Sequence, residues 1–213
     1  MKKQETDIQE FGFLVDKAKE AGAAEARITP ADQIIVEDRV RQKCSTGCYE
    51  YGKYLTCPPY APPVEDFRKS LRDYRYALVV RFRSETEFRE EIRYSLFHEL
   101  IDPSAKKESK ESAFAFVTAY VTEGRKLHRA MLELEHAAFN AGYAFALTTI
   151  CGPGCRLCEK CNTAAGTCNF PTMKRHSPES LGINVVKTAA NAGMQIQFPA
   201  PKNPERIAVL LID

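Results

Sequence analysis

The stretch CGPGCRLCEKCNTAAGTC, from Cys151 to Cys168, constrains this chain most strongly, because it holds five of the eight cysteines. Such density is typical of a disulfide knot, a zinc site or an iron–sulfur cluster. The N-terminal segment lacks the apolar core and cleavage site of a signal peptide, so we expect a cytoplasmic protein. Cytosolic thiols are kept reduced, and a chain of 213 residues can build a core without disulfides. The sequence therefore favours a metal centre over a disulfide knot.

Charge and hydropathy exclude two classes of partner. The formal net charge is +2, with 27% charged and 44% hydrophobic residues, as in ordinary soluble domains. A nucleic-acid-binding protein would need a stronger and more local basic excess. No apolar run approaches the roughly 18 residues of a membrane span. We expect neither nucleic acid nor membrane as a partner.

The periodicity of apolar residues predicts alternating helices and strands. Helices are expected over 5–21, 65–73, 84–100, 112–141 and 184–193. Strands are expected within 24–40 and over 76–82, 142–150 and 206–213. This alternation predicts an α/β or α+β fold with one mixed sheet, flanking helices and cysteine loops at strand ends. We expect a single domain over 1–213, allowing for a helical insertion around 84–112.

The cysteines form two clusters of different spacing. The first is Cys44-x3-Cys48-x8-Cys57, in a stretch rich in glycine and proline that predicts irregular backbone. The second is Cys151-x3-Cys155-x2-Cys158-x2-Cys161-x6-Cys168. Its two x2 spacings are those of the bacterial ferredoxin run, whereas structural zinc prefers two separated CxxC pairs. The spacing favours iron–sulfur clusters over zinc, and zinc over redox thiols or core cysteines.

Eight cysteines equal the ligands of two complete [4Fe–4S] clusters, and three partitions fit the spacing. The simplest gives one cluster to Cys155, Cys158, Cys161 and Cys168, and the other to Cys44, Cys48, Cys57 and Cys151. A crossed scheme exchanges Cys151 with Cys168. In a third scheme, Cys44, Cys48 and Cys57 bind a cluster alone, and its fourth iron is open to a substrate as a Lewis acid.

Three stretches together, CSTGCYEYGKYLTCPPYAP, GPGCRLCEKC and SLGINVVKTAANAG, resemble a family of predicted metal-binding proteins. These proteins carry a cysteine-rich domain of unknown function and occur largely in anaerobic bacteria and methanogenic archaea. The resemblance spans roughly residues 35 to 195 and implies metal binding, with iron–sulfur clusters as the expected form. It extends to seven cysteines and less clearly to Cys151, which keeps the open-iron scheme in view. Residues 175–179 read RHSPE, so the proline stands at a different position from that in the family pattern.

Other polar residues are candidates for supporting roles. His176, close to the second cluster, is expected to be a solvated residue before a helix cap, with proton donor or ligand as the alternative. His128 and His136 lie two turns apart on a predicted helix and are expected on its surface. Cations and tyrosines near the cysteines would tune a cluster, attract an acidic partner or cover it: Lys53, Arg156, Lys160, Lys174, Arg175, Tyr49, Tyr51, Tyr54 and Tyr60.

Three functions follow from these patterns. The first is a protein with one or two [4Fe–4S] clusters that transfers single electrons to a redox partner protein in anaerobic metabolism. The second is an iron–sulfur enzyme whose cluster at Cys44, Cys48 and Cys57 binds a small-molecule substrate. The third is a structural zinc protein that acts as an interaction module.

Overall fold

The computed structural model of the chain describes residues 9–87, 100, 102–152, 154–198 and 201–213. Four strands form one sheet in the order β1–β2–β4–β3: β1 Glu25–Pro30, β2 Tyr76–Arg83, β4 Glu205–Ile212 and β3 Leu147–Thr148. All pairings in this sheet are antiparallel. The described α-helices are α2 Gly12–Glu20, α3 Asp38–Gly47, α4 Val64–Ser70, α6 Lys107–Asn140 and α7 Val185–Asn191. The prediction of one sheet with flanking helices is confirmed, and antiparallel pairing favours the α+β class.

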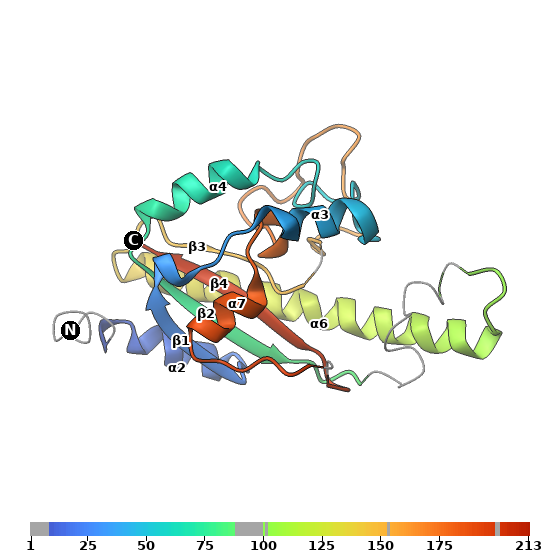
Figure 1. Cartoon of the computed structure of the whole chain (residues 1–213), viewed down its shortest axis with the longest axis horizontal. Coiled ribbons are helices and arrows are strands. Elements are labelled where there is room, and N and C mark those ends of the chain that lie inside the picture. The colour runs from blue at the N-terminus through green and yellow to red at the C-terminus, as the bar shows by residue number, and fades with distance from the viewer. Residues whose placement is uncertain (1–8, 88–99, 101, 153, 199–200) are drawn as a thin grey trace.

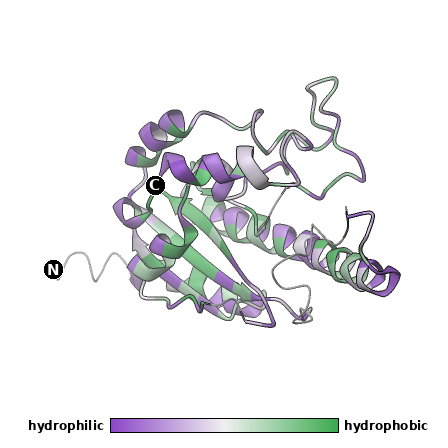
Figure 2. Ribbon diagram, turned by 45° about the vertical axis from the view of Figure 1, so that its right-hand side comes forward, coloured by the Kyte–Doolittle hydropathy of each residue, from purple (hydrophilic) through white to green (hydrophobic). Residues whose placement is uncertain are grey.

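The two central strands are buried on both faces, because side chains alternate between opposite sides of a sheet. In β2, Leu78 and Val80 face one layer of helices, while Ala77 and Val79 face the other. In Figure 2 these strands are the most continuously hydrophobic part of the fold. The apolar run at 206–213, predicted to be a central strand, lies between β2 and β3.

Helices cover both faces of the sheet (Figure 1). Leu14 of α2 and Met131 and Leu134 of α6 pack on one face and are fully buried. Phe67 of α4 and Ala189 of α7 pack on the other. The N-terminal part of α6 extends past the sheet, and none of the described helices is long and apolar enough to cross a membrane.

Most predicted elements are present, and several differ in length. The helix predicted over 112–141 begins earlier, at Lys107, and the one predicted over 65–73 continues as a 3-10 turn from Leu71 to Asp73. The helix expected over 84–100 lies largely outside the described residues. Of the strand predicted over 142–150, only Leu147 and Thr148 pair with β4.

Thr149 ends that strand and turns the chain toward the cysteines. Its hydroxyl accepts a hydrogen bond of 2.8 Å from the Val209 N–H, while its own N–H donates to the Val209 carbonyl at 2.8 Å. The next residue, Ile150, donates instead to the His176 carbonyl at 2.9 Å. A side chain has thus replaced a backbone partner of β4, and the chain leaves the sheet directly before Cys151.

Candidate metal centre

Three cysteines from the first cluster line one cavity of about 260 Å³. We call Cys44, Cys48 and Cys57 the cavity group. The prediction that all three lie on irregular backbone is wrong for Cys44, which lies in α3, while Cys48 caps the C-terminal end of that helix. A rigid helix end therefore positions two of the three thiols.

The cavity is walled by the end of α3, the 48–58 loop and the turn before α7. Apolar atoms dominate its lining, with the polar groups Lys43 and Glu179 among its walls. Ser177, which also lines the cavity, interacts through its side chain with Glu179. The remaining lining residues are Val40, Tyr51, Pro58, Gly154 and Ser180. A concave, mostly apolar site with few polar groups is typical of a small-molecule site.

Four cysteines of the second cluster gather in the irregular loop after β3. We call Cys155, Cys158, Cys161 and Cys168 the loop group. Burial raises the pKa of the Cys155 thiol, and the other three thiols of the group raise it further by repulsion. The three other thiols are therefore part of the electrostatic surroundings of Cys155.

Polar N–H groups point at the sulfur atoms of the loop group. The backbone N–H of Phe170 donates to Cys168 Sγ at 3.4 Å, and the Asn169 side-chain amide donates to Cys158 Sγ at 3.8 Å. The backbone N–H of Leu55 donates to Cys161 Sγ at 3.4 Å. These donors stabilise negative charge on sulfur, which is the form in which a thiol binds metal.

The 50–57 loop and the loop group are joined by further hydrogen bonds. The Cys155 N–H donates to Thr56 Oγ1 at 3.2 Å, and His176 Nδ1 donates to the Thr56 carbonyl at 3.0 Å. Thr56, which directly precedes Cys57, is therefore hydrogen-bonded both to the loop group and to His176.

Tyr54 and Arg156 fill the space between the two loops. The Arg156 guanidinium lies over the Tyr54 ring, 4.7 Å from its centroid, and also pairs with Glu50. A Cβ atom on Gly154 would come within 2.8 Å of the Tyr54 ring. Both Cys57 and Cys161 act on the pKa of Tyr54, after burial, Arg156 and Glu50. The Tyr54 ring therefore packs against the chain just before Cys155, from the loop that carries Cys57.

Cys151 does not line the cavity of the cavity group. Its thiol is 4% exposed and lines a small cavity of about 20 Å³ with Tyr120, Gly124 and Arg206. None of the other cysteines lines this cavity. Burial raises the pKa of Cys151 to about 12, which Arg206 opposes.

Arg206 fixes this corner of the fold. Its guanidinium lies 3.4 Å from the centroid of the Tyr120 ring and donates to the Tyr120 carbonyl at 2.6 Å and to Glu123 at 2.8 Å. A Cβ atom on Gly124 would come within 3.0 Å of Arg206 Nη1, and one on Gly152 within 3.4 Å. Sequence reasoning missed this buried cation, because its partners Tyr120 and Glu123 lie 86 and 83 positions away in the sequence.

Burial also raises the pKa of Cys57 to about 12, and repulsion from Cys48 adds to it. Reactive redox thiols have lowered pKa values instead. The buried cysteines of this site therefore do not have the environment of redox nucleophiles.

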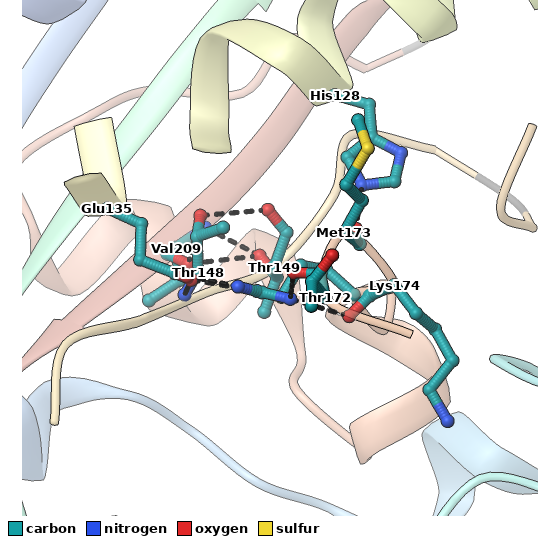
Figure 3. A network of polar contacts seen from close by, with 9 residues as sticks. His128, Glu135, Thr148, Thr149, Thr172, Met173, Lys174 and Val209 are labelled. Atoms are coloured by element: carbon teal, nitrogen blue, oxygen red, sulfur yellow. Dashed lines mark hydrogen bonds and ion pairs between the residues drawn. The ribbon is translucent and has the colours of Figure 1, made fainter. Parts of the chain in front are cut away.

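A second polar network anchors the segment that follows the loop group (Figure 3). Glu135 of α6 accepts from the Thr148 N–H at 2.7 Å and from Arg175 Nε at 2.8 Å. His128 Nε2 donates to the Met173 carbonyl at 2.9 Å. These contacts attach residues 173–175 to α6 and to the end of β3.

The expectation that His128 lies on the helix surface is wrong, because the side chain is 2% exposed. His136 is exposed, as expected. His176 is half-buried rather than solvated, and burial lowers its pKa. Arg175 and Arg156 are used in structural ion pairs, and Lys53 lies over the Tyr49 ring.

Within the described part of the chain, no three His, Cys, Asp or Glu side chains are arranged to hold a single metal ion. The grouping of the cysteines therefore rests on their shared cavity, their mutual electrostatics and the hydrogen bonds between their loops.

Comparison with known proteins gives one match. A protein-family model described as "Predicted metal-binding protein (DUF2284)" matches residues 27–212. No curated protein and no solved structure matches the chain. The match includes all eight cysteines and confirms the resemblance noted in the sequence, over a longer range.

Proposed function

Because the chain belongs to this family of predicted metal-binding proteins, we propose that it is an iron–sulfur protein with two [4Fe–4S] centres. The loop group would ligate one centre through four thiolates. The cavity group would hold the other through three, with Cys151 as a structural residue beside Arg206. When bound, the clusters would supply one-electron chemistry and, at the cavity group, an iron with a free coordination position.

The chemistry of the donors supports this assignment. Thiolates are the usual protein ligands of iron–sulfur clusters, and N–H groups directed at sulfur are among the features that set their potential. The loop group has such donors at Cys158, Cys161 and Cys168. The residues present therefore fit a cluster.

The observation that carries the proposal is the contact of Leu55 with Cys161. Leu55 is two residues before Cys57, and its N–H is 3.4 Å from the Cys161 sulfur. Two residues span at most about 7 Å of chain. The two cysteine groups are therefore adjacent, as a protein that moves single electrons between two centres requires.

The three-cysteine group supports a reaction rather than electron storage alone. Its three thiols line a cavity of about 260 Å³, part of which a cluster would fill, and a small molecule would reach the free iron from the remaining space. Val40, Tyr51 and Pro58 would exclude water from that side, while Lys43 and Glu179 would contact polar parts of the molecule. The function best supported is one-electron transfer from a partner through the loop group to a small molecule in the cavity.

Metal and sulfide analysis of anaerobically purified protein tests the proposal. We expect a brown protein that absorbs near ~400 nm and contains iron and acid-labile sulfide in equal amounts. EPR of the dithionite-reduced protein should show signals of two interacting clusters, because the two groups are adjacent. A colourless protein that contains zinc without sulfide would overturn the proposal and favour the structural zinc alternative.

A further inference from the structure

The cavity beside Cys44, Cys48 and Cys57 adjoins a second hollow. This hollow, of about 570 Å³, lies between α3 and the start of α7. Val40, Lys43 and Glu179 line both spaces. We call the second hollow the α3–α7 groove. The two spaces therefore adjoin along these three side chains.

Three cations stand around the α3–α7 groove. Arg39 and Lys43 come from α3, and Lys187 comes from α7. Side chains of Arg39 and Lys187 are 65% and 52% exposed, so both reach solvent. In the part of the chain that the structure describes, the Lys43 ammonium has neither an ion-pair nor a hydrogen-bond partner. Glu179 in the lining and Glu37, which pairs with Arg39 and Lys187, offset two of these charges, so the groove keeps a net positive charge.

The carboxylate of Glu37 binds two of these three cations, Arg39 and Lys187. Its carboxylate accepts from Arg39 Nε at 2.8 Å, from Lys187 Nζ at 2.6 Å and from Asn184 Nδ2 at 2.7 Å. These hydrogen bonds lower the pKa of Glu37 to about 2. One carboxylate thus faces two cations and one amide, and Lys43 adds a further positive charge.

We infer that the α3–α7 groove and the cavity together bind a small organic anion, a carboxylate or a phosphate. Its charged group would lie among Lys43, Arg39 and Lys187, and its other end would lie in the apolar cavity beside Val40 and Tyr51. The position of the uncharged end, beside the cavity group, rests on the proposed function. The inference adds the chemical class of the substrate. Together the two spaces are of the size of sites that hold small ligands.

Calorimetric titration of the anaerobic, cluster-loaded protein at low ionic strength tests the inference. Succinate represents the carboxylates, inorganic phosphate represents the phosphates, and uncharged succinamide is the control ligand. We expect one of the two anions to bind and succinamide not to bind. Binding should weaken as salt is raised, because salt screens exposed charges.

Substitutions that remove either a positive or a negative charge from the groove test where the anion binds. Lys43→Gln and Lys187→Gln should each weaken binding about three- to tenfold. Glu37→Gln should strengthen it, because the competing carboxylate is removed while an amide oxygen remains for Asn184. A variant that merely damages the fold would not bind more tightly. Lys19→Gln, on exposed α2, makes the same charge change elsewhere and should leave the affinity unchanged.

The same samples separate this inference from the proposed function. Absence of iron and sulfide overturns the proposed function, whatever the titration shows. If clusters are present and neither anion binds, or if Lys19→Gln weakens binding as much as Lys43→Gln, the inference is overturned. Addition of the bound anion should also change the EPR spectrum of the reduced protein. An unchanged spectrum would overturn the placement of its other end beside the cavity group.

Discussion

The backbone N–H of Leu55 donates a hydrogen bond of 3.4 Å to Cys161 Sγ, although the two residues are 106 positions apart. This contact fixes the position of Cys161 relative to Cys57, which follows Leu55 by two residues. The two cysteine clusters of the sequence therefore form one region of the molecule. Substitutions within this region should have effects that depend on which group they touch.

Cysteine substitutions should separate ligands from structural residues. Cys161→Ser should remove about half of the iron and sulfide, because the loop group loses a thiolate. Cys151→Ser should leave both unchanged, because Cys151 lies beside Arg206 rather than beside other thiols. Iron, sulfide and EPR measurements on anaerobic protein check both results. If Cys151→Ser loses as much iron as Cys161→Ser, Cys151 belongs among the ligands.

Gly154→Ala should destabilise the junction of the two loops. Gly154 has φ +69°, and an added Cβ would lie 2.8 Å from the Tyr54 ring. Backbone strain costs about 1–2 kcal/mol and forced overpacking about 1–3 kcal/mol more. Gly166→Ala is the matched control, because its φ is +65° and nothing lies within 4 Å of its added Cβ. Urea unfolding should show a larger loss for Gly154→Ala, and equal losses would contradict the packing argument.

The elements of the fold were largely predictable, because periodicity is local information. The apolar runs at 76–82 and 206–213 form the two central strands, and the predicted long helix is α6. Strand β3 was overestimated at both ends, because turns precede it at 141–145 and the hydroxyl of Thr149 takes a hydrogen bond that a longer strand would give to backbone. Composition alone does not reveal such a replacement.

The cysteine clusters were visible in the sequence, but their surroundings were not. Spacing identified the loop group, whereas the helical position of Cys44 was masked by the glycines and prolines that follow it. His128 was expected on a surface, because its partner, the Met173 carbonyl, is 45 positions away. Contacts between distant segments, such as Leu55 with Cys161, depend on tertiary packing and leave no local pattern.

Glu123→Gln should reduce stability strongly. Glu123 is the ion-pair partner of Arg206, whose side chain is 2% exposed. Removal of one partner from a buried pair leaves an uncompensated charge and costs about 3–5 kcal/mol. Glu111→Gln, in an exposed pair with Lys107 at 3.9 Å, should cost less than about 0.5 kcal/mol. Denaturant unfolding of both variants measures the difference, and a loss below about 1 kcal/mol for Glu123→Gln would contradict this role of the pair.

The buried imidazole of His128 should make stability depend on pH. Burial lowers its pKa below the usual 6.5, although the hydrogen bond to Met173 partly opposes this. The folded protein therefore holds fewer protons at this residue than the unfolded chain does. By linkage, the stability from neutral His128 is fully present above about pH 6.5 and is lost as pH falls through the lower pKa of the folded state. His128→Gln keeps an N–H donor for the Met173 carbonyl but does not titrate. Thermal unfolding of both proteins between pH 7.5 and pH 5 should show a steeper decline for the wild type, with exposed His136→Gln as the control variant. Parallel declines of the wild type and His128→Gln would show that another group is responsible.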